Sequence, residues 1–147
     1  MIDHVYISVA NLTRSAAFYK QFLASLGWRE FGLHKSTAAG VPDLHGFLEA
    51  AYGNGQIGCS IWLRQRQAGE TGLYIGLVAD SPEEVNAAAD AAVAAGATLE
   101  SPTGNRDHFG PGYYAANVVD FDGNRIEIGD RNPPPPTRPH TINACNI

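Results

Sequence analysis

HVYISVANLTRSAAFYKQFLASLGW (residues 4–28) and LYIGLVADSPEEVNAAADAAVAAGA (residues 73–97) are two copies of one pattern. Each copy has an alternating apolar stretch, a polar break, a helical pattern and a glycine that follows the helix. At a shift of 69 residues, Val9 meets Val78 and Gly27 meets Gly96. An internal repeat of this kind indicates two similar supersecondary units.

The apolar stretch of each copy alternates with a period of two, which predicts a β-strand with one face toward a core. In the first copy, Val5 and Ile7 share the face that we expect a helix to cover, and His4 and Tyr6 share the other. The shift of 69 residues places Leu73 and Ile75 at the positions of His4 and Tyr6. In the second copy, the same shift leaves Tyr74, Gly76 and Val78 on the covered face.

The helical stretches carry start and stop signals. Ser81-Pro82 followed by Glu84 is typical of a helix start, with serine as the N-cap, and Gly27 and Gly96 are typical of helix stops. Three strand candidates follow each helix, at about 28–34, 44–50 and 57–64, and then at about 97–101, 112–119 and 124–129.

These elements predict an α+β fold of two tandem βαβββ repeats. We expect them to form a partly closed, cup-shaped mixed sheet with the helices on the outside. The predicted organisation is one domain over 1–131, with repeats at about 1–65 and 70–131, followed by a proline-rich tail over 132–147.

The amino-acid composition limits the kinds of molecule that the protein is expected to bind. The chain has 147 residues and a formal net charge of −5, which disfavours nucleic acid and anionic membranes. No apolar run approaches the roughly 20 residues of a membrane span, and the start of the chain does not resemble a secretory signal. The two cysteines are too few for a disulfide framework. We therefore expect a cytoplasmic protein with a small-molecule partner.

The predicted faces opposite the helices combine aromatic, apolar and ionisable side chains, which is typical of a small-molecule cavity. Trp62 and Arg64 share such a face with Glu127, provided that the two halves close around it. The candidate ligand-binding residues are Tyr6, Trp62, Arg64, Leu73, Ile75, His108, Tyr113 and Tyr114.

Three segments resemble the vicinal oxygen chelate superfamily, which includes glyoxalase I, extradiol dioxygenases, and fosfomycin- and bleomycin-resistance proteins. They are Asp3-His4-Val5, Arg14-Ser15-Ala16-Ala17-Phe18-Tyr19, and Val119-Asp120-Phe121-Asp122-Gly123-Asn124-Arg125-Ile126-Glu127. The last is similar to the family's D-P-D-G-N-x-I-E run, with Phe121 in place of proline. The resemblance spans residues 1–131 and implies that the protein forms a homodimer.

The resemblance also implies a divalent metal site. His4 and Glu127 match family ligand positions and suit zinc, nickel, manganese or iron. The other two positions fall on Leu73 and Trp62, which cannot bind a metal, so a protein without metal is an equal expectation and glyoxalase I activity is disfavoured.

Two functional hypotheses stay open. In the first, His4 and Glu127 are catalytic, in metal-assisted lyase, isomerase or oxygenase chemistry or in proton transfer. In the second, the cavity sequesters a small aromatic or oxygenated molecule without turnover, as bleomycin-resistance proteins do.

Overall fold

The structure, a computed structural model, describes residues 4–35, 37, 39, 43–49 and 59–130. The predicted tail over 132–147 lies outside these residues. The elements, in order, are β1 (His4–Val9), α1 (Leu12–Ala24), β2 (Arg29–His34), β3 (Leu44–Leu48), β4 (Ser60–Gln65), β5 (Tyr74–Ala79), α2 (Pro82–Ala94), β6 (Thr98–Asn105), β7 (Tyr114–Val119) and β8 (Arg125–Asp130). The predicted tandem βαβββ order is confirmed.

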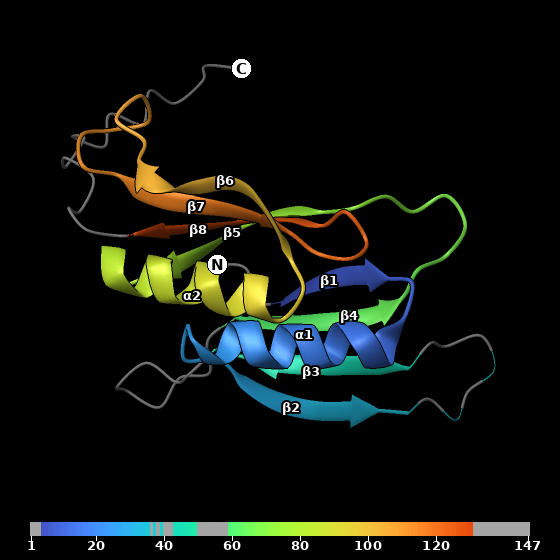
Figure 1. The fold of residues 1–147 in the computed structure, drawn as a ribbon. Helices are drawn as coiled ribbons and strands as arrows, with labels where there is room; N and C mark the ends of the chain where they lie inside the picture. The colour runs from blue at the N-terminus through green and yellow to red at the C-terminus, as the bar shows by residue number, and fades with distance from the viewer. Residues whose placement is uncertain (1–3, 36, 38, 40–42, 50–58, 131–147) are drawn as a thin grey trace, which may run out of the picture.

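The strands form two four-stranded sheets, in the orders β1-β4-β3-β2 and β5-β8-β7-β6 (Figure 1). In each sheet the first strand pairs in parallel with the last, and the other pairs are antiparallel. The mixed character of the sheets is as predicted. The strands do not form one continuous cup, however, because each repeat completes a sheet of its own.

Both helices begin and end where local chemistry favours it. The Asn11 side chain accepts a hydrogen bond from the Arg14 backbone N–H, and Ser81 accepts one from Glu84, so each N-cap satisfies an end group of its helix. Gly27 and Gly96 follow the helices with φ of 77° and 109°, a conformation that favours glycine. The start predicted at Ser81 and both predicted stops are confirmed.

One apolar core lies between the helices and the sheets. Tyr19, Phe22 and Leu23 of α1 pack with Ile61 and Leu63 of β4, all of them at most 1% exposed. The second half contributes smaller helical side chains to the same core, namely Val85, Ala88, Ala89 and Ala92. Each fully buried large apolar side chain stabilises the fold by about 1.5–3 kcal/mol. Among the described residues, no helix is long and apolar enough to cross a membrane.

The run that resembles D-P-D-G-N is the turn between β7 and β8, and it joins the two halves. The buried Asp120 carboxylate accepts the Tyr19 phenol at 2.8 Å and the Asn124 amide at 2.7 Å. Asn124 also donates to the Ser8 carbonyl of β1 at 3.3 Å and accepts the Leu73 backbone N–H at 2.9 Å. The turn is therefore structural, and it fixes the position of β1 relative to the start of β5.

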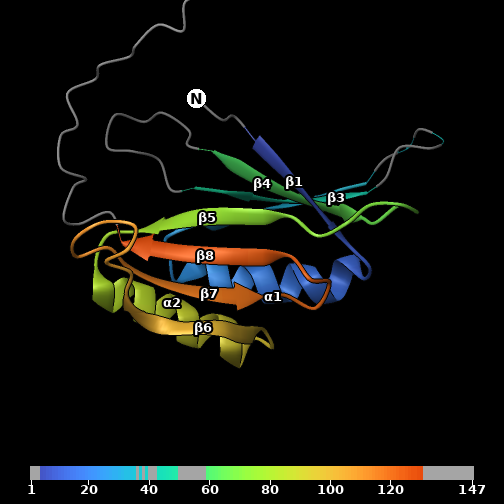
Figure 2. The same cartoon turned by 90° about the horizontal axis from the view of Figure 1, so that it is seen from above.

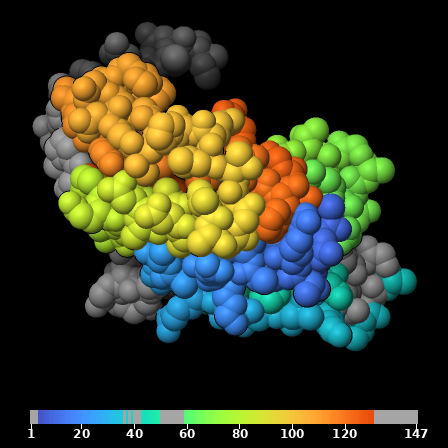
Figure 3. Space-filling view, in the orientation of Figure 1, coloured from blue at the N-terminus to red at the C-terminus, as the bar shows by residue number. Residues whose placement is uncertain are grey.

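Each helix covers one face of the sheet of its own repeat, and the two helices pack against each other. In Figure 1, α1 lies in front of β3 and β4, whereas Figure 2 shows β7 and β8 lying over the helices when seen from above. In the space-filling view, the helices cover much of the same front face (Figure 3). The helix-free faces of the two sheets, here called the first and second outer faces, therefore point in different directions within one chain.

Candidate functional site

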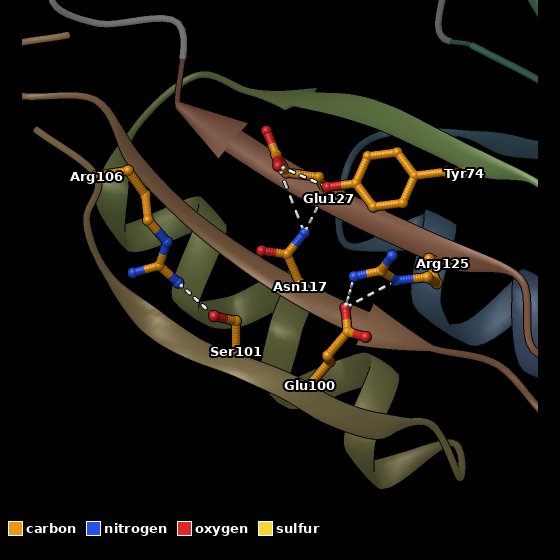
Figure 4. A network of polar contacts seen from close by, with 7 residues as sticks. All are labelled: Tyr74, Glu100, Ser101, Arg106, Asn117, Arg125 and Glu127. Carbon is orange, nitrogen blue, oxygen red and sulfur yellow. Dashed lines mark hydrogen bonds and ion pairs between the residues drawn. The ribbon is translucent and has the colours of Figure 1, made fainter. Parts of the chain in front are cut away.

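The second outer face carries a carboxylate surrounded by hydrogen-bond donors. Glu127 of β8 accepts the Tyr113 phenol on Oε1 at 2.6 Å and the Tyr74 phenol on Oε2 at 2.9 Å. The Asn117 amide donates to the same Oε2 at 3.4 Å and to the Tyr74 hydroxyl at 3.0 Å (Figure 4). We call Glu127, Tyr74, Tyr113 and Asn117 the Glu127 cluster. Its members come from β5, β7, β8 and the loop before β7.

A glycine makes room for one of the two phenols. A Cβ placed on Gly129 would meet the Tyr113 hydroxyl, so this ring crosses β8 only because position 129 has no side chain. Gly76, opposite Glu127 on β5, has nothing within 4 Å of its Cβ position, which leaves the surface beside the carboxylate open. The Glu127 cluster therefore lies on an accessible face.

The hydrogen bonds hold the cluster in one protonation state. Partial burial alone would raise the pKa of the Glu127 carboxyl, but the bonds from Tyr113, Tyr74 and Asn117 outweigh it, so this pKa is lowered. Burial first, and then the bond to Glu127, raise the pKa of both Tyr74 and Tyr113. Near neutral pH the cluster is thus a carboxylate that accepts hydrogen bonds from neutral phenols.

The predicted faces of β5 are wrong. Leu73 and Ile75 pack against the core, and Leu77 is buried in it, whereas Tyr74 and Val78 are 51% and 46% exposed. The N-caps explain the error: Asn11 and Ser81 are 70 residues apart, so the strand that precedes them must also be shifted by 70. Tyr74, not Leu73, is the counterpart of His4.

The first outer face is aromatic. The Trp62 ring lies over Gly46 of β3, whose Cβ would come within 2.7 Å of it, and Phe31 packs edge-on against that ring at 5.7 Å. His4 contacts Tyr6 in the same way at 5.1 Å. Among the described residues, the partners of Glu127 all belong to the second half, and His4 is not one of them. Within one chain, the structure does not join the two residues predicted to be catalytic.

Three of the predicted ligand-binding residues do meet. Tyr6, Arg64 and Leu73 line one hollow of about 380 Å³ between the first sheet and the segment that leads into β5. Arg64 forms an ion pair there with Glu70, which also lines the hollow. The guanidinium is thus held by a neighbouring carboxylate.

Of the other residues predicted to bind a ligand, His108 lies in a surface loop and Tyr114 faces the interior. His108 packs on Phe109 in the loop before β7, with ring centroids 4.2 Å apart. Tyr114 does not reach an outer face, because it packs against the core and donates to Asn86 of α2 at 3.0 Å. Its prediction as a cavity aromatic is corrected.

Tyr74 and Asn117 are the residues that the sequence did not suggest. Counting from the N-caps would have found Tyr74. No sequence signal marks Asn117, which joins the cluster through the pairing of β7 with β8. Arg125 completes this face, since its guanidinium lies 5.0 Å from the Tyr74 ring and pairs with Glu100 at 2.8 Å (Figure 4).

Comparisons with known proteins identify the family of the chain. Residues 1–128 match the family model "Glyoxalase/Bleomycin resistance protein/Dioxygenase superfamily". No curated protein matches the sequence. A glyoxalase/bleomycin resistance protein from Albidiferax ferrireducens T118 is similar in structure, with 28% identity, a TM-score of 0.65, and coverage of 89% of this chain and 98% of that one.

Two further solved structures share the fold at lower identity. One is a superfamily member from Sphaerobacter thermophilus DSM 20745, with 16% identity, a TM-score of 0.64, and coverage of 88% and 96% of the two chains. The other is a mutant of the fosfomycin resistance protein FosX from Listeria monocytogenes, complexed with Mn(II) and 1S,2S-dihydroxypropylphosphonic acid. It has 18% identity, a TM-score of 0.62, and coverage of 87% and 90%. The chain belongs to the Glyoxalase/Bleomycin resistance protein/Dioxygenase superfamily.

Proposed function

We propose that the protein binds a small aromatic or oxygenated molecule on its outer faces, and that it does so without a metal ion. The observation that carries this proposal is the Glu127 cluster. Both carboxylate oxygens already accept donors, at 2.6 Å and 2.9 Å, from phenols of the same half. Each oxygen keeps a lone pair for a polar group of a ligand, whereas a metal ion would have to share the carboxylate with both phenols.

The residues at the other family ligand positions also fit a metal poorly. Trp62 has no atom that binds a divalent cation, and its indole N–H donates to Ser60 at 3.1 Å. Tyr74 is kept protonated by its bond to Glu127, whereas a phenol must lose its proton to bind a metal tightly. Among the described residues, no group of three or more His, Cys, Asp or Glu side chains could hold a metal.

The chemistry of the faces supports a role in binding. Glu127 offers a partly exposed carboxylate to a polar group of a ligand, and the exposed ring of Tyr74 lies beside it. Tyr74 is 51% exposed and Tyr6 is 48% exposed, so both rings can stack on a flat molecule. Arg64, which pairs with Glu70 in the hollow near Tyr6, has further N–H donors for an oxygenated substituent.

We further propose that two copies associate through their outer faces as a homodimer. Exposed apolar side chains on both faces support this, notably Phe31 at 64% and Val78 at 46%. Such an association would bring the His4 side of one copy to the Glu127 cluster of the other, as the predicted site requires. Sedimentation should then give about twice the 15.7 kDa of one chain, and Val78→Asp should shift it toward the monomer.

Metal analysis and ligand binding on one preparation test the proposed function. Protein purified without chelator should contain less than about one metal ion per ten chains, and added Zn²⁺, Ni²⁺, Mn²⁺ or Fe²⁺ should not raise its melting temperature. A thermal-shift screen of aromatic acids and phenols should find a ligand that Trp62→Ala weakens. Stoichiometric metal that disappears in His4→Ala would overturn the metal-free proposal and favour the enzyme hypothesis.

A further inference from the structure

A second hollow lies on the opposite side of the first sheet from the outer face. It has a volume of about 990 Å³ and lies between α1 and the strands β2, β3 and β4. Small side chains of α1, Ala16 and Ala17, form part of its wall, whereas the large side chains of that helix pack in the core. Leu12 and Leu33 make this wall more apolar.

A bulge in β2 builds the polar end of this hollow. The register of β2 against β3 shifts between Glu30 and Gly32, and Gly32 has a φ of +124°. Glu30 pairs with Phe47, and Leu33 pairs with His45, so the bulge turns both Glu30 and Leu33 toward the helix. Bulges of this kind re-aim side chains at functional sites.

Three charged or titratable groups are linked at this end. The His45 Nε2 lies 2.7 Å from Glu30 Oε1, and the Lys20 ammonium lies 2.6 Å from Oε2. The side chain of His45 is only 14% exposed, and its ring packs near Phe47 at 5.3 Å. The Glu30 carboxylate is therefore fully engaged by the two groups, which lower its pKa.

The lining holds two ammonium groups, of Lys20 and Lys35, and two carboxylates, of Glu30 and Asp43. Lys35 lines the hollow and forms no ion pair within the described part of the chain, whereas Asp43, the other acidic group of the lining, already has an interaction of its own. An entering anion would meet the Lys35 ammonium, with Lys20 and His45 nearby, and an apolar body would lie along the alanine wall.

We propose that this hollow is a second ligand site, distinct from the outer faces, which binds an organic carboxylate with an apolar body. The small residues of α1 provide the space, the bulge in β2 turns Glu30 toward His45 and Lys20, and Lys35 provides an ammonium group. The site lies entirely within the first repeat. It does not depend on the proposed function of the outer faces.

Isothermal titration with sodium octanoate tests the proposal, with 1-octanol and octylamine as probes of the same length. Octanoate should bind measurably, and the neutral and cationic probes should bind at least tenfold more weakly. Lys35→Gln should weaken octanoate at least fivefold. Equal binding of octanol and octanoate, or no binding of octanoate at millimolar concentration, would overturn the assignment.

A matched pair of variants locates the site. Ala17 and Ala87 are exposed alanines at the same position of α1 and α2, 70 residues apart, and only Ala17 is part of the lining of this hollow. Ala17→Phe should abolish octanoate binding, and Ala87→Phe should leave it unchanged, while both keep the wild-type circular dichroism. Octanoate binding that survives Ala17→Phe but is lost in Trp62→Ala would place the ligand on the outer face and refute the second site.

Discussion

A tyrosine hydroxyl and an asparagine amide donate to one carboxylate at two places in the molecule, once in the interior and once at the surface. In the interior, the Asp120 carboxylate accepts Tyr19 at 2.8 Å and Asn124 at 2.7 Å, and it is 7% exposed. Tyr19 comes from the first repeat and Asp120 from the second. These hydrogen bonds therefore hold the two repeats together.

At the surface, Glu127 accepts Tyr113 at 2.6 Å and Asn117 at 3.4 Å, with Tyr74 as an additional donor. All these residues belong to the second repeat and lie on a face that no helix covers. Similar donors therefore surround two carboxylates that have different roles. Because Asp120 is buried, its hydrogen bonds stabilise the fold. Because Glu127 is partly exposed, its carboxylate is available to a ligand.

The largest expected effect of a substitution is at the buried carboxylate. Asp120→Ala removes the acceptor of the Tyr19 phenol, the Asn124 amide and the backbone N–H groups of Asp122 and Asn124. Several buried donors lose their partner, so we expect a loss of about 3 kcal/mol in the free energy of unfolding. Urea unfolding followed by tryptophan fluorescence measures it. A loss below that of Glu127→Ala would contradict the contrast between the two carboxylates.

Substitution of Tyr19 and of Tyr113 compares the buried and the exposed carboxylate directly. Tyr19→Phe leaves an oxygen of Asp120 short of a donor in the interior, and we expect a cost of about 2 kcal/mol. Tyr113→Phe removes the matching bond at the surface, where water can replace it, and we expect about 0.5 kcal/mol. Both variants remove one hydroxyl, so thermal unfolding in one buffer compares them directly. Equal losses would mean that exposure does not weaken the surface bond.

Two glycines next to Glu127 test how its cluster is assembled. Gly129→Ala places a methyl group against the Tyr113 hydroxyl and should displace that ring, at a cost of about 1 kcal/mol. Gly76→Ala is the matched control on the neighbouring strand, where the methyl group meets nothing within 4 Å. We expect it to be neutral or to stabilise by up to about 0.5 kcal/mol. Urea midpoints would distinguish the two, and similar losses in both would show that the Tyr113 contact does not matter.

The fold could be predicted from the sequence because its signals are local. Alternation in β1, the cap at Ser81 and the glycines after both helices each follow from neighbouring residues. The assignment of the two faces of β5 was also wrong for a local reason. From N-cap to terminal glycine the first copy runs from 11 to 27 and the second from 81 to 96, one residue shorter, so aligning the glycines displaced the preceding strand.

The candidate site could be predicted only in part. Glu127 was found through its resemblance to a family motif, and the same motif includes Asp120, whose role here is structural. The partners of Glu127 depend on a ring that crosses β8 above Gly129 and on the pairing of Asn117 with Glu127 across two strands. Neither contact leaves a periodic or short-range signal, since both depend on tertiary packing.

The smallest expected effect is a dependence of stability on pH. The pKa of Glu127 is lowered in the folded state, so within the window between the folded and the ordinary value the native protein binds fewer protons than the unfolded chain. The stabilisation is therefore present above the ordinary pKa and is lost as the pH falls through the folded one. Because Glu127 is partly exposed, we expect only about 0.5 kcal/mol after solvent screening.

Glu127→Gln isolates this contribution, because the amide cannot titrate and its oxygen still accepts one phenol. The difference in unfolding free energy between wild type and Glu127→Gln, measured by urea titration, should be larger at pH 7 than at pH 3. Asp90→Asn, on the exposed side of α2, serves as the control for loss of a surface carboxylate. If the difference at Glu127 were the same at both pH values, the phenols would not hold the carboxylate in its charged form.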